Sequence, residues 1–301
     1  MALTPEVLQN IAFSKKMGFD KLDQLPPAVT RKKMKQIPKN PAPIPVGEVI
    51  NYIIPGENIL VRIYIPEGAG PFPVVSYFHG GGFVLMSVDS VDDICRQICA
   101  CSVSVVMSVE YLLAPEDKYP KGPDSCIKAT KWMIEHAEKY KADGKRIAVG
   151  GDSAGGYMSL YAAQKLTLEG IKLKAQFAAY PVTDHYTSNH LSYDENKEGY
   201  ILTAQIMKWF WDNYLTNDSR INEASPLRTK DFSSLPSALI MTANYDPLRD
   251  EGKEYADKLI DAGVNTIYKN YENVHGFLGT GEMGQKALEV ACDFLKDKLS
   301  I

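Results

Sequence analysis

The chain has 301 residues, of which 45% are hydrophobic and 23% are charged, and its formal net charge is -4. The composition is that of a globular protein, and 33 basic residues against 37 acidic ones leave no basic surface for nucleic acid. No apolar run approaches the roughly 18 residues of a membrane span, and the start of the chain lacks the basic and apolar regions of a secretory signal. We therefore expect a cytoplasmic protein that neither binds nucleic acid nor inserts into a membrane.

The chain begins with a predicted helical arm. Apolar residues follow helical spacing near the start, and a basic run comes next, at residues 30–35. Prolines then make a stiff, extended connector, because each proline fixes its own φ angle and disfavours helix in the residue before it. These prolines are Pro38, Pro41, Pro43 and Pro45. We therefore predict an N-terminal helical arm over residues 1–45.

From residue 46 onward, predicted strands alternate with predicted helices. The strands are expected at residues 48–54, 59–65, 73–78, 103–109, 146–149, 175–179, 238–242 and 264–271. The helices are expected at residues 89–101, 123–140, 154–168, 249–262 and 284–299. The first two strands are joined by a Pro-Gly turn, as in an antiparallel hairpin, whereas most later strands are continuously apolar, as in strands buried on both faces. This order indicates an α/β fold with a mostly parallel sheet.

One segment interrupts this alternation. Residues 184–226 mix polar and aromatic side chains and include a predicted helix at residues 203–214. We predict that this insertion forms a lid. The last predicted strand, at residues 264–271, could lie at an exposed edge of the sheet, where pairing with a second copy would give a homodimer.

The five cysteines do not indicate a metal site. Cys95 and Cys99 lie four residues apart on a predicted helix, but no second cluster and no nearby histidine completes the four ligands of structural zinc. A chain of this size does not need disulfides to fold. We expect reduced thiols that behave as small buried hydrophobic groups, and no bound metal.

A glycine-rich turn follows the strand at residues 146–149 and opens the helix at residues 154–168. It reads Gly151-Asp152-Ser153-Ala154-Gly155, which is the strand, turn and helix arrangement of a nucleophile elbow. Small residues two positions before and after the serine prevent clashes in this strained turn. A glycine-rich turn with an incidental serine would give the same pattern, so Ser153 needs a second motif to support it as a nucleophile.

A second motif follows the strand at residues 73–78. It reads His79-Gly80-Gly81-Gly82, and consecutive glycines let backbone N–H groups approach a substrate oxygen with no Cβ in the way. We predict that Gly81 and Gly82, together with Ala154 of the elbow, donate hydrogen bonds to an oxyanion. A phosphate-binding loop would need Gly-Lys-Ser/Thr at its end, whereas Phe-Val follows here.

Only one of the five histidines lies where a general base is expected. His275 comes just after the last predicted strand and before the last helix. The other four lie in the glycine loop, in a charged helix, or next to and within the insertion: His79, His136, His185 and His190. A lone histidine is often structural, but the chain order Ser, Asp, His of a catalytic triad favours His275 as the base.

The acid of such a triad should lie between the serine and the histidine, at the end of a strand. Asp246 follows the strand at residues 238–242 directly. Asp250 is the alternative, although its place early in the next helix suits the N-terminal turn of that helix. We prefer Asp246 because it is closer to the end of the strand.

These motifs together resemble the hormone-sensitive lipase family of serine esterases. The segments that carry the resemblance are HGGGF, EYLLAPE from Glu110 to Glu116, GDSAGG, DPLRDEG and HGF. The resemblance covers about residues 45–300. It implies an α/β-hydrolase fold, with a mostly parallel eight-stranded sheet flanked by helices and with a helical cap. Tyr157 and Glu110 stand where this family commonly has Asn and Asp, which leaves the subfamily and the substrate preference open.

The resemblance also implies how the chain is divided and which residues act. The catalytic core would comprise residues 46–183 and 227–301, and the cap would comprise the arm and residues 184–226. Ser153 matches the nucleophile of the family, Asp246 its acid and His275 its base. The oxyanion donors match Gly81, Gly82 and Ala154, and the supporting motif positions match His79, Gly80, Gly151, Asp152 and Gly155.

The function implied is hydrolysis of small carboxylic esters through an acyl-enzyme, without a metal or an organic cofactor. A lid of about 40 residues and a short arm suggest a pocket for short soluble esters rather than a lipid interface. An amidase or a serine peptidase uses the same triad chemistry and stays open as an alternative. A non-catalytic small-molecule receptor, similar to the plant gibberellin receptors, is disfavoured because His275 is present at the position of the base.

Overall fold

Eight strands form one sheet in the part of the chain that the computed structural model describes, which is residues 3–36 and 41–300. The strand order is β1-β2-β4-β3-β5-β6-β7-β8, and only β2 runs antiparallel to its neighbours. The strands are β1 (Glu48–Ile54), β2 (Ile59–Ile65), β3 (Phe72–Phe78), β4 (Val105–Glu110), β5 (Ala142–Asp152), β6 (Ala175–Ala179), β7 (Ser237–Tyr245) and β8 (Thr266–Val274). The predicted mostly parallel α/β sheet is therefore confirmed. Pro38 of the predicted connector lies outside the described residues.

Five strands, β3, β4, β5, β7 and β8, differ in their bounds from the prediction, by up to four residues at one end. β4 begins at Val105 rather than at residue 103, because Val103 adopts a left-handed conformation, with φ of 52°, that ends the preceding helix. β5 begins at Ala142, which pairs with Phe72 at the start of β3; a register shift follows over the polar residues 143–146, and regular pairing resumes at Ile147. A polar segment gives no strand pattern in the sequence, so only the pairing reveals it.

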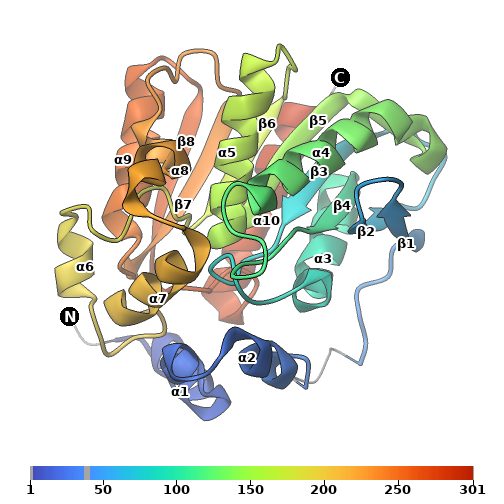
Figure 1. The fold of residues 1–301 in the computed structure, drawn as a ribbon. Coiled ribbons are helices and arrows are strands. Elements are labelled where there is room, and N and C mark those ends of the chain that lie inside the picture. The colour runs from blue at the N-terminus through green and yellow to red at the C-terminus, as the bar shows by residue number, and fades with distance from the viewer. Residues whose placement is uncertain (1–2, 37–40, 301) are drawn as a thin grey trace.

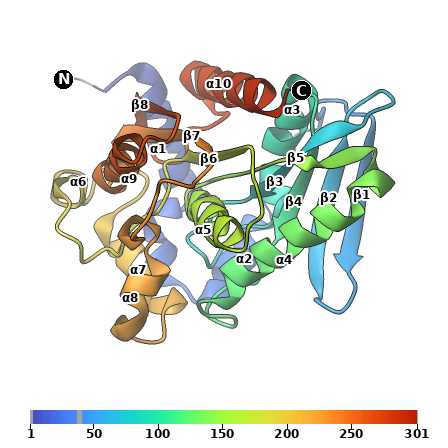
Figure 2. The same ribbon diagram turned by 90° about the horizontal axis from the view of Figure 1, so that it is seen from above.

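Helices cover both faces of the sheet (Figures 1 and 2). One face is covered by α4 (Lys121–His136), α5 (Ala154–Leu168) and α9 (Arg249–Asp261), and the other by α3 (Asp92–Ser102) and α10 (Gly281–Leu299). Two predicted helices are shorter than expected, because 3-10 turns occupy Val88–Val91 before α3 and Ala137–Tyr140 after α4. The cysteines are free thiols, as predicted, and Cys101 is exposed whereas the other four are buried.

The arm and the insertion lie together at one end of the sheet (Figure 1). The arm forms α1 (Pro5–Met17) and α2 (Pro27–Met34), joined through a 3-10 turn at Phe19–Gln24 that contacts α7. The insertion forms α6 (Leu191–Glu195), α7 (Ala204–Tyr214) and α8 (Ile221–Ala224). Thr203 caps α7: its hydroxyl accepts a hydrogen bond from the Ile206 N–H, and this satisfies one of the unpaired donors of the first turn. The predicted helices of both segments are therefore present.

One arginine fastens the arm to the core. Arg31 of α2 donates two hydrogen bonds to the carboxylate of Glu116, at 3.0 and 2.8 Å. It donates two more to the backbone carbonyls of Val84 and Ala114, at 2.7 and 2.5 Å. The planar guanidinium thus ties α2 to the loops that follow β3 and β4.

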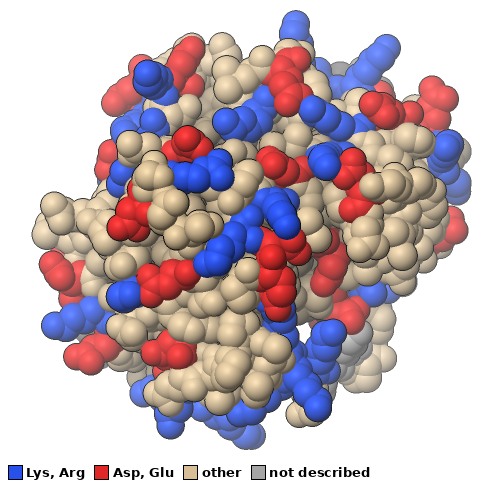
Figure 3. Space-filling model, viewed as in Figure 1, with Lys and Arg blue, Asp and Glu red and all other residues tan. Residues whose placement is uncertain are grey.

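The surface has charges of both signs (Figure 3). Acidic and basic side chains are interspersed over the face shown, and basic side chains gather at its lower margin, over the arm. Among the described helices, none has both the length and the apolar character needed to cross a bilayer. β8 is an edge strand of the sheet, as predicted, and its pairing with a second copy stays a prediction.

Candidate active site

Ser153 lies in a strained turn between β5 and α5. Its backbone has φ of 55° and ψ of -120°, a conformation that a residue with a Cβ rarely adopts. The Ser153 N–H donates to the Ala179 carbonyl at 2.9 Å, which holds the turn at the end of the neighbouring strand β6. This geometry presents the serine hydroxyl beyond the sheet at the N-terminus of α5, where the helix dipole favours negative charge.

The glycines on either side of this turn, Gly151 and Gly155, are required because a larger residue would clash with the backbone. A Cβ on Gly155 would overlap the backbone carbonyl of Phe78 at the end of β3, and a Cβ on Gly151 would overlap the backbone of Gly155. Backbone atoms of two strands and a helix meet here, so no side chain can move aside. The predicted need for small residues around Ser153 is confirmed.

His275 bridges Ser153 and Asp246. The His275 Nε2 atom lies 2.9 Å from Ser153 Oγ, and the Nδ1 atom lies 2.7 Å from Asp246 Oδ2. Asp246 follows β7 and His275 follows β8, and these strands are parallel neighbours, so both side chains emerge at the same edge of the sheet. The carboxylate of Asp246 is fully buried, and its other oxygen accepts a hydrogen bond from the Leu248 N–H at 2.9 Å. With a proton on Nδ1 directed at Asp246, Nε2 accepts from the serine hydroxyl.

Asp250 has a different environment. Its carboxylate accepts a hydrogen bond from the Ser192 N–H at 2.8 Å and forms an ion pair with Arg249 at 2.8 Å. The structure therefore brings Asp246, and not Asp250, to His275, which agrees with the preference drawn from the strand end.

The glycine loop at residues 79–82 lies beside Ser153. Gly81 and Gly82 both have positive φ angles, 110° and 58°, and both line the same cavity as Ser153 and His275. A Cβ on Gly82 would overlap the ring of Phe210 from α7, so the loop backbone is in direct contact with the lid helix. Ala154, the third predicted oxyanion donor, is the first residue of α5 and directly follows Ser153.

His79 of the same loop is a structural histidine. Its ring is fully buried and stacks on Tyr111 with the ring centroids 4.3 Å apart, and Nδ1 lies 2.7 Å from the Gly80 carbonyl oxygen. Burial lowers the pKa of His79 to about 4, so the imidazole is neutral near pH 7. Its assignment to the loop rather than to proton transfer agrees with this environment.

Comparisons with known proteins place the chain in a family. A family described as "alpha/beta hydrolase fold" matches residues 75–279. The chain belongs to this family. It is 36% identical over 259 residues to Esterase LipI of Mycobacterium tuberculosis, covering 83% of this chain and 80% of that protein. It is 34% identical over 271 residues to an arylesterase of Saccharolobus solfataricus, covering 87% and 86%.

Solved structures agree with this membership. The metagenomic carboxylesterase EstE1 has a TM-score of 0.86 and 34% identity, with 92% of this chain and 99% of that chain covered. A hyperthermophilic esterase from Pyrobaculum calidifontis has a TM-score of 0.88 and 32% identity, with both chains covered over 100% of their length. The α/β-hydrolase fold and the resemblance to the hormone-sensitive lipase family are therefore confirmed.

In this hydrolase, Asp152 joins the elbow to the glycine loop. Its carboxylate accepts a hydrogen bond from the Tyr77 hydroxyl at 2.8 Å, and its Oδ2 atom would lie 2.5 Å from a Cβ on Gly80. Burial raises the pKa of Asp152 to about 6, because the charged form loses its hydration. The sequence marked Asp152 only as a motif position, and the contact with Tyr77 of β3 has no signal in the sequence.

The hydrolase site opens into a mostly apolar cavity of about 230 Å³. Arm, core and insertion each supply part of its wall, including Phe13, Leu22 and Met34 from the arm, Leu85 and Tyr180 from the core, and Ile206 and Phe210 from α7. Sequence reasoning missed Tyr180, whose ring contacts His275 with the centroids 4.8 Å apart and which follows β6 with φ of 38°. Among the described residues, no group of three or more His, Cys, Asp or Glu side chains could hold a metal ion.

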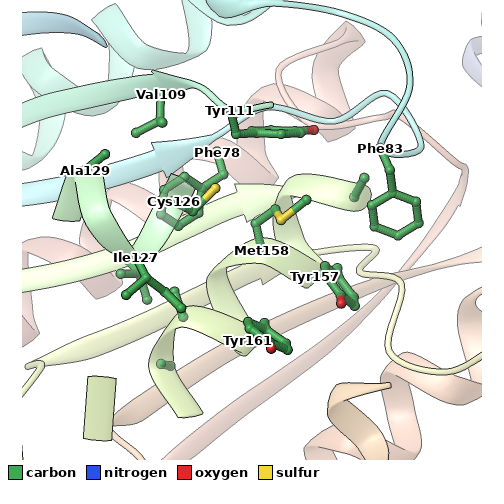
Figure 4. Packing of buried hydrophobic residues seen from close by; sticks show 14 of the residues in the cluster. Phe78, Phe83, Val109, Tyr111, Cys126, Ile127, Ala129, Tyr157, Met158 and Tyr161 are labelled. Atoms are coloured by element: carbon green, nitrogen blue, oxygen red, sulfur yellow. The ribbon is translucent and has the colours of Figure 1, made fainter. Parts of the chain in front are cut away.

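An aromatic cluster connects the elbow helix with the lid. Tyr157 of α5 lies near Phe83, which follows the glycine loop, with the ring centroids 5.0 Å apart (Figure 4). The Tyr214 hydroxyl of α7 donates to the Tyr157 hydroxyl at 3.1 Å, and Tyr214 stacks on Phe83 at 4.0 Å. Tyr157, which departs from the Asn common in this family, thus packs behind the site and does not face the cavity.

Proposed function

We propose that this hydrolase cleaves short-chain carboxylic esters through an acyl-enzyme formed on Ser153, with His275 as general base and Asp246 as the acid that orients it. Its membership in a family whose similar members are named esterases makes it a carboxylic ester hydrolase. The observation that carries the proposal is the continuous pair of hydrogen bonds from Asp246 through His275 to Ser153.

The first half of the reaction transfers the acyl group to the enzyme. Ser153 Oγ attacks the ester carbonyl carbon while His275 Nε2 takes the hydroxyl proton, and a tetrahedral oxyanion forms. Asp246 stabilises the imidazolium and keeps the tautomer that leaves Nε2 free to accept. The intermediate then collapses, the bond to the alkoxy group breaks, and the leaving alcohol takes the proton from His275.

The second half of the reaction releases the acid. Water attacks the acyl-enzyme carbonyl as His275 accepts its proton, and collapse returns that proton to Ser153 Oγ. In both halves the N–H groups of Gly81, Gly82 and Ala154 donate to the oxyanion. This role is supported by two observations: Gly81 and Gly82 line the same cavity as Ser153, and Ala154 is the first residue of the helix that follows it.

The cavity supports a preference for short acyl chains. Its volume of about 230 Å³ is below the roughly 300–1,000 Å³ typical of pockets for drug-sized ligands. Its apolar walls suit an alkyl group. We propose that the predicted arm (residues 1–45) and insertion (residues 184–226) form its cover over a core of residues 46–183 and 227–301, which is supported by the residues of both segments that line the cavity, among them Phe13 and Phe210. No residue of the proposed chemistry requires a metal or an organic cofactor, and a cytoplasmic location stays a prediction.

Hydrolysis of a p-nitrophenyl ester series, from acetate to dodecanoate, tests the proposal against matched anilides. We expect the highest kcat/KM on the short esters, little hydrolysis of anilides, and no marked rise in rate on micelles. The Ser153→Ala variant should fold normally by circular dichroism and lose nearly all turnover, on the order of 10⁶-fold in kcat for a triad nucleophile. A preference for anilides would indicate an amidase, inactivity on every substrate would indicate a receptor, and undiminished activity of the variant would exclude Ser153 as nucleophile.

A further inference from the structure

The short helix α6 of the insertion is bound to the loop that carries Asp246. This loop, residues 246–248, joins β7 to α9. Ser192 lies in α6 and Asn196 directly follows the helix as its C-cap residue, and both side chains are buried. Buried polar side chains are normally hydrogen-bonded, so the hydrogen-bond partners of Ser192 and Asn196 show which groups these side chains fix in place.

Asn196 holds the backbone on either side of the β7 end. Its Nδ2 group donates to the carbonyl of Asp246 at 3.2 Å and to the carbonyl of Asn244 at 3.4 Å. One side-chain amide thus binds both the end of β7, at Asn244, and Asp246, the residue whose carboxylate contacts His275. The Asp246 carbonyl also accepts a hydrogen bond from the Arg249 N–H at 3.1 Å, so this carbonyl is bound both by Asn196 and by the first residue of α9.

Ser192 makes a reciprocal contact with the start of α9. Its hydroxyl donates to the Pro247 carbonyl at 2.6 Å and accepts from the Asp250 N–H at 3.3 Å, while its own N–H donates to the Asp250 carboxylate at 2.8 Å. Neither α6 nor α9 has a side-chain cap from its own N-cap residue. The two helix N-termini therefore cap each other, and each supplies the acceptor that the other lacks.

The same region of α9 also holds the beginning of the insertion. The buried carboxylate of Glu251 accepts hydrogen bonds from the N–H groups of Thr183, at 2.6 Å, and Asp184, at 3.1 Å. The Thr183 hydroxyl donates to the Glu251 carbonyl at 2.9 Å. The insertion is thus fixed to α9 both where it leaves the core and at α6, which makes a rigid connection between the lid and the loop of Asp246.

We propose that Ser192 and Asn196 are positioning residues for Asp246, so that this part of the lid belongs to the catalytic apparatus rather than only covering the cavity. The inference rests on the proposed function, because it concerns how Asp246 meets His275. When α6 no longer restrains the loop, the carboxylate of Asp246 is free to move away from His275 Nδ1. A carboxylate farther from the ring stabilises the imidazolium less, which weakens the base without touching the substrate.

The test compares Asn196→Leu, which keeps the branched shape of the side chain but is larger and removes the donor, and Ser192→Ala with the matched control Asp194→Asn. Asp194 lies on the same helix and is exposed. We expect both buried variants to lower kcat by about 10- to 100-fold, a part of the 10²–10⁴-fold that a positioned general base contributes, with KM changed less than about twofold. The acid limb of the kcat/KM profile should move to lower pH, and Ser192→Thr, which retains the hydroxyl, should recover part of kcat.

Titration of reactive serine with a p-nitrophenyl phosphonate ester, which phosphonylates the serine hydroxyl and releases p-nitrophenol, separates positioning from loss of folded enzyme. A positioning role leaves the number of reactive serines near one per chain and lowers the rate per site. If the number of reactive serines falls while the rate per site and the acid limb stay as in the wild type, the two residues only stabilise the fold, and the inference is wrong. If Ser153→Ala stays active, the proposed function itself fails, whereas an inactive Ser153→Ala with unchanged α6 variants overturns only the positioning role.

Discussion

The buried carboxylate of Asp152 makes the stability of this protein depend on pH in a defined window. Burial raises its pKa from the ordinary 3.8 to about 6, mainly by desolvation, against an opposing hydrogen bond from Tyr77. Between about pH 4 and pH 6 the folded state therefore binds more protons at this site than the unfolded state does. The free energy of unfolding contributed by Asp152 is then fully present below pH 4 and is lost as the pH rises through 6.

The size of this change in unfolding free energy follows from the difference between the folded and unfolded pKa of Asp152. Each unit of difference between the pKa in the folded state and the pKa in the unfolded state corresponds to about 1.4 kcal/mol. The difference between 3.8 and about 6 therefore corresponds to about 3 kcal/mol of unfolding free energy. Asp152→Asn removes the charge and keeps an oxygen acceptor for the Tyr77 hydroxyl. Relative to this variant, the wild type should lose about 3 kcal/mol of unfolding free energy between pH 4 and pH 8.

Urea unfolding of both proteins at pH 4, 5, 6 and 8 measures this difference. The comparison of wild type with variant cancels the titration of groups that do not interact with Asp152, and Asp194→Asn at an exposed position serves as the control with no expected pH dependence. A difference between wild type and Asp152→Asn that is constant with pH, or that favours the wild type increasingly at high pH, would show that burial does not dominate at Asp152.

Three further variants test the turn, the close packing around it and the arm. Ser153→Gly should be more stable than Ser153→Ala by about 1–2 kcal/mol, because only glycine tolerates φ of 55° without strain, and equal urea midpoints would contradict this. Gly155→Ala should cost about 3 kcal/mol or more, because its Cβ overlaps the Phe78 carbonyl, and a near-normal melting temperature would show that the backbone can yield there. Arg31→Ala should release the arm, since four hydrogen bonds to the core are lost, and should raise KM and speed proteolysis of the arm, whereas Lys32→Ala at the exposed neighbouring position should do neither.

The local features of this fold could be predicted because they depend on neighbours in the sequence. Apolar runs and helical spacing gave the order of strands and helices, and α5 was predicted with its observed bounds. The elbow around Ser153 was recognisable because a strand, a tight turn and a helix in succession leave room only for small flanking residues. His275 could be chosen because the chain has few histidines and the order of a triad is constrained.

Contacts between distant segments required the tertiary structure. Asp246 and Asp250 stand four residues apart after the same strand, and only the fold shows that the first faces His275 while the second caps α6. Likewise, no pattern in the sequence pairs Arg31 with Glu116. Sequence periodicity reports which face of an element is apolar, but the direction of a polar side chain depends on partners that the packing of other elements brings to it. The sequence by itself thus determined the kind of chemistry, and the tertiary structure decided which carboxylate contacts His275 and which segments hold it in place.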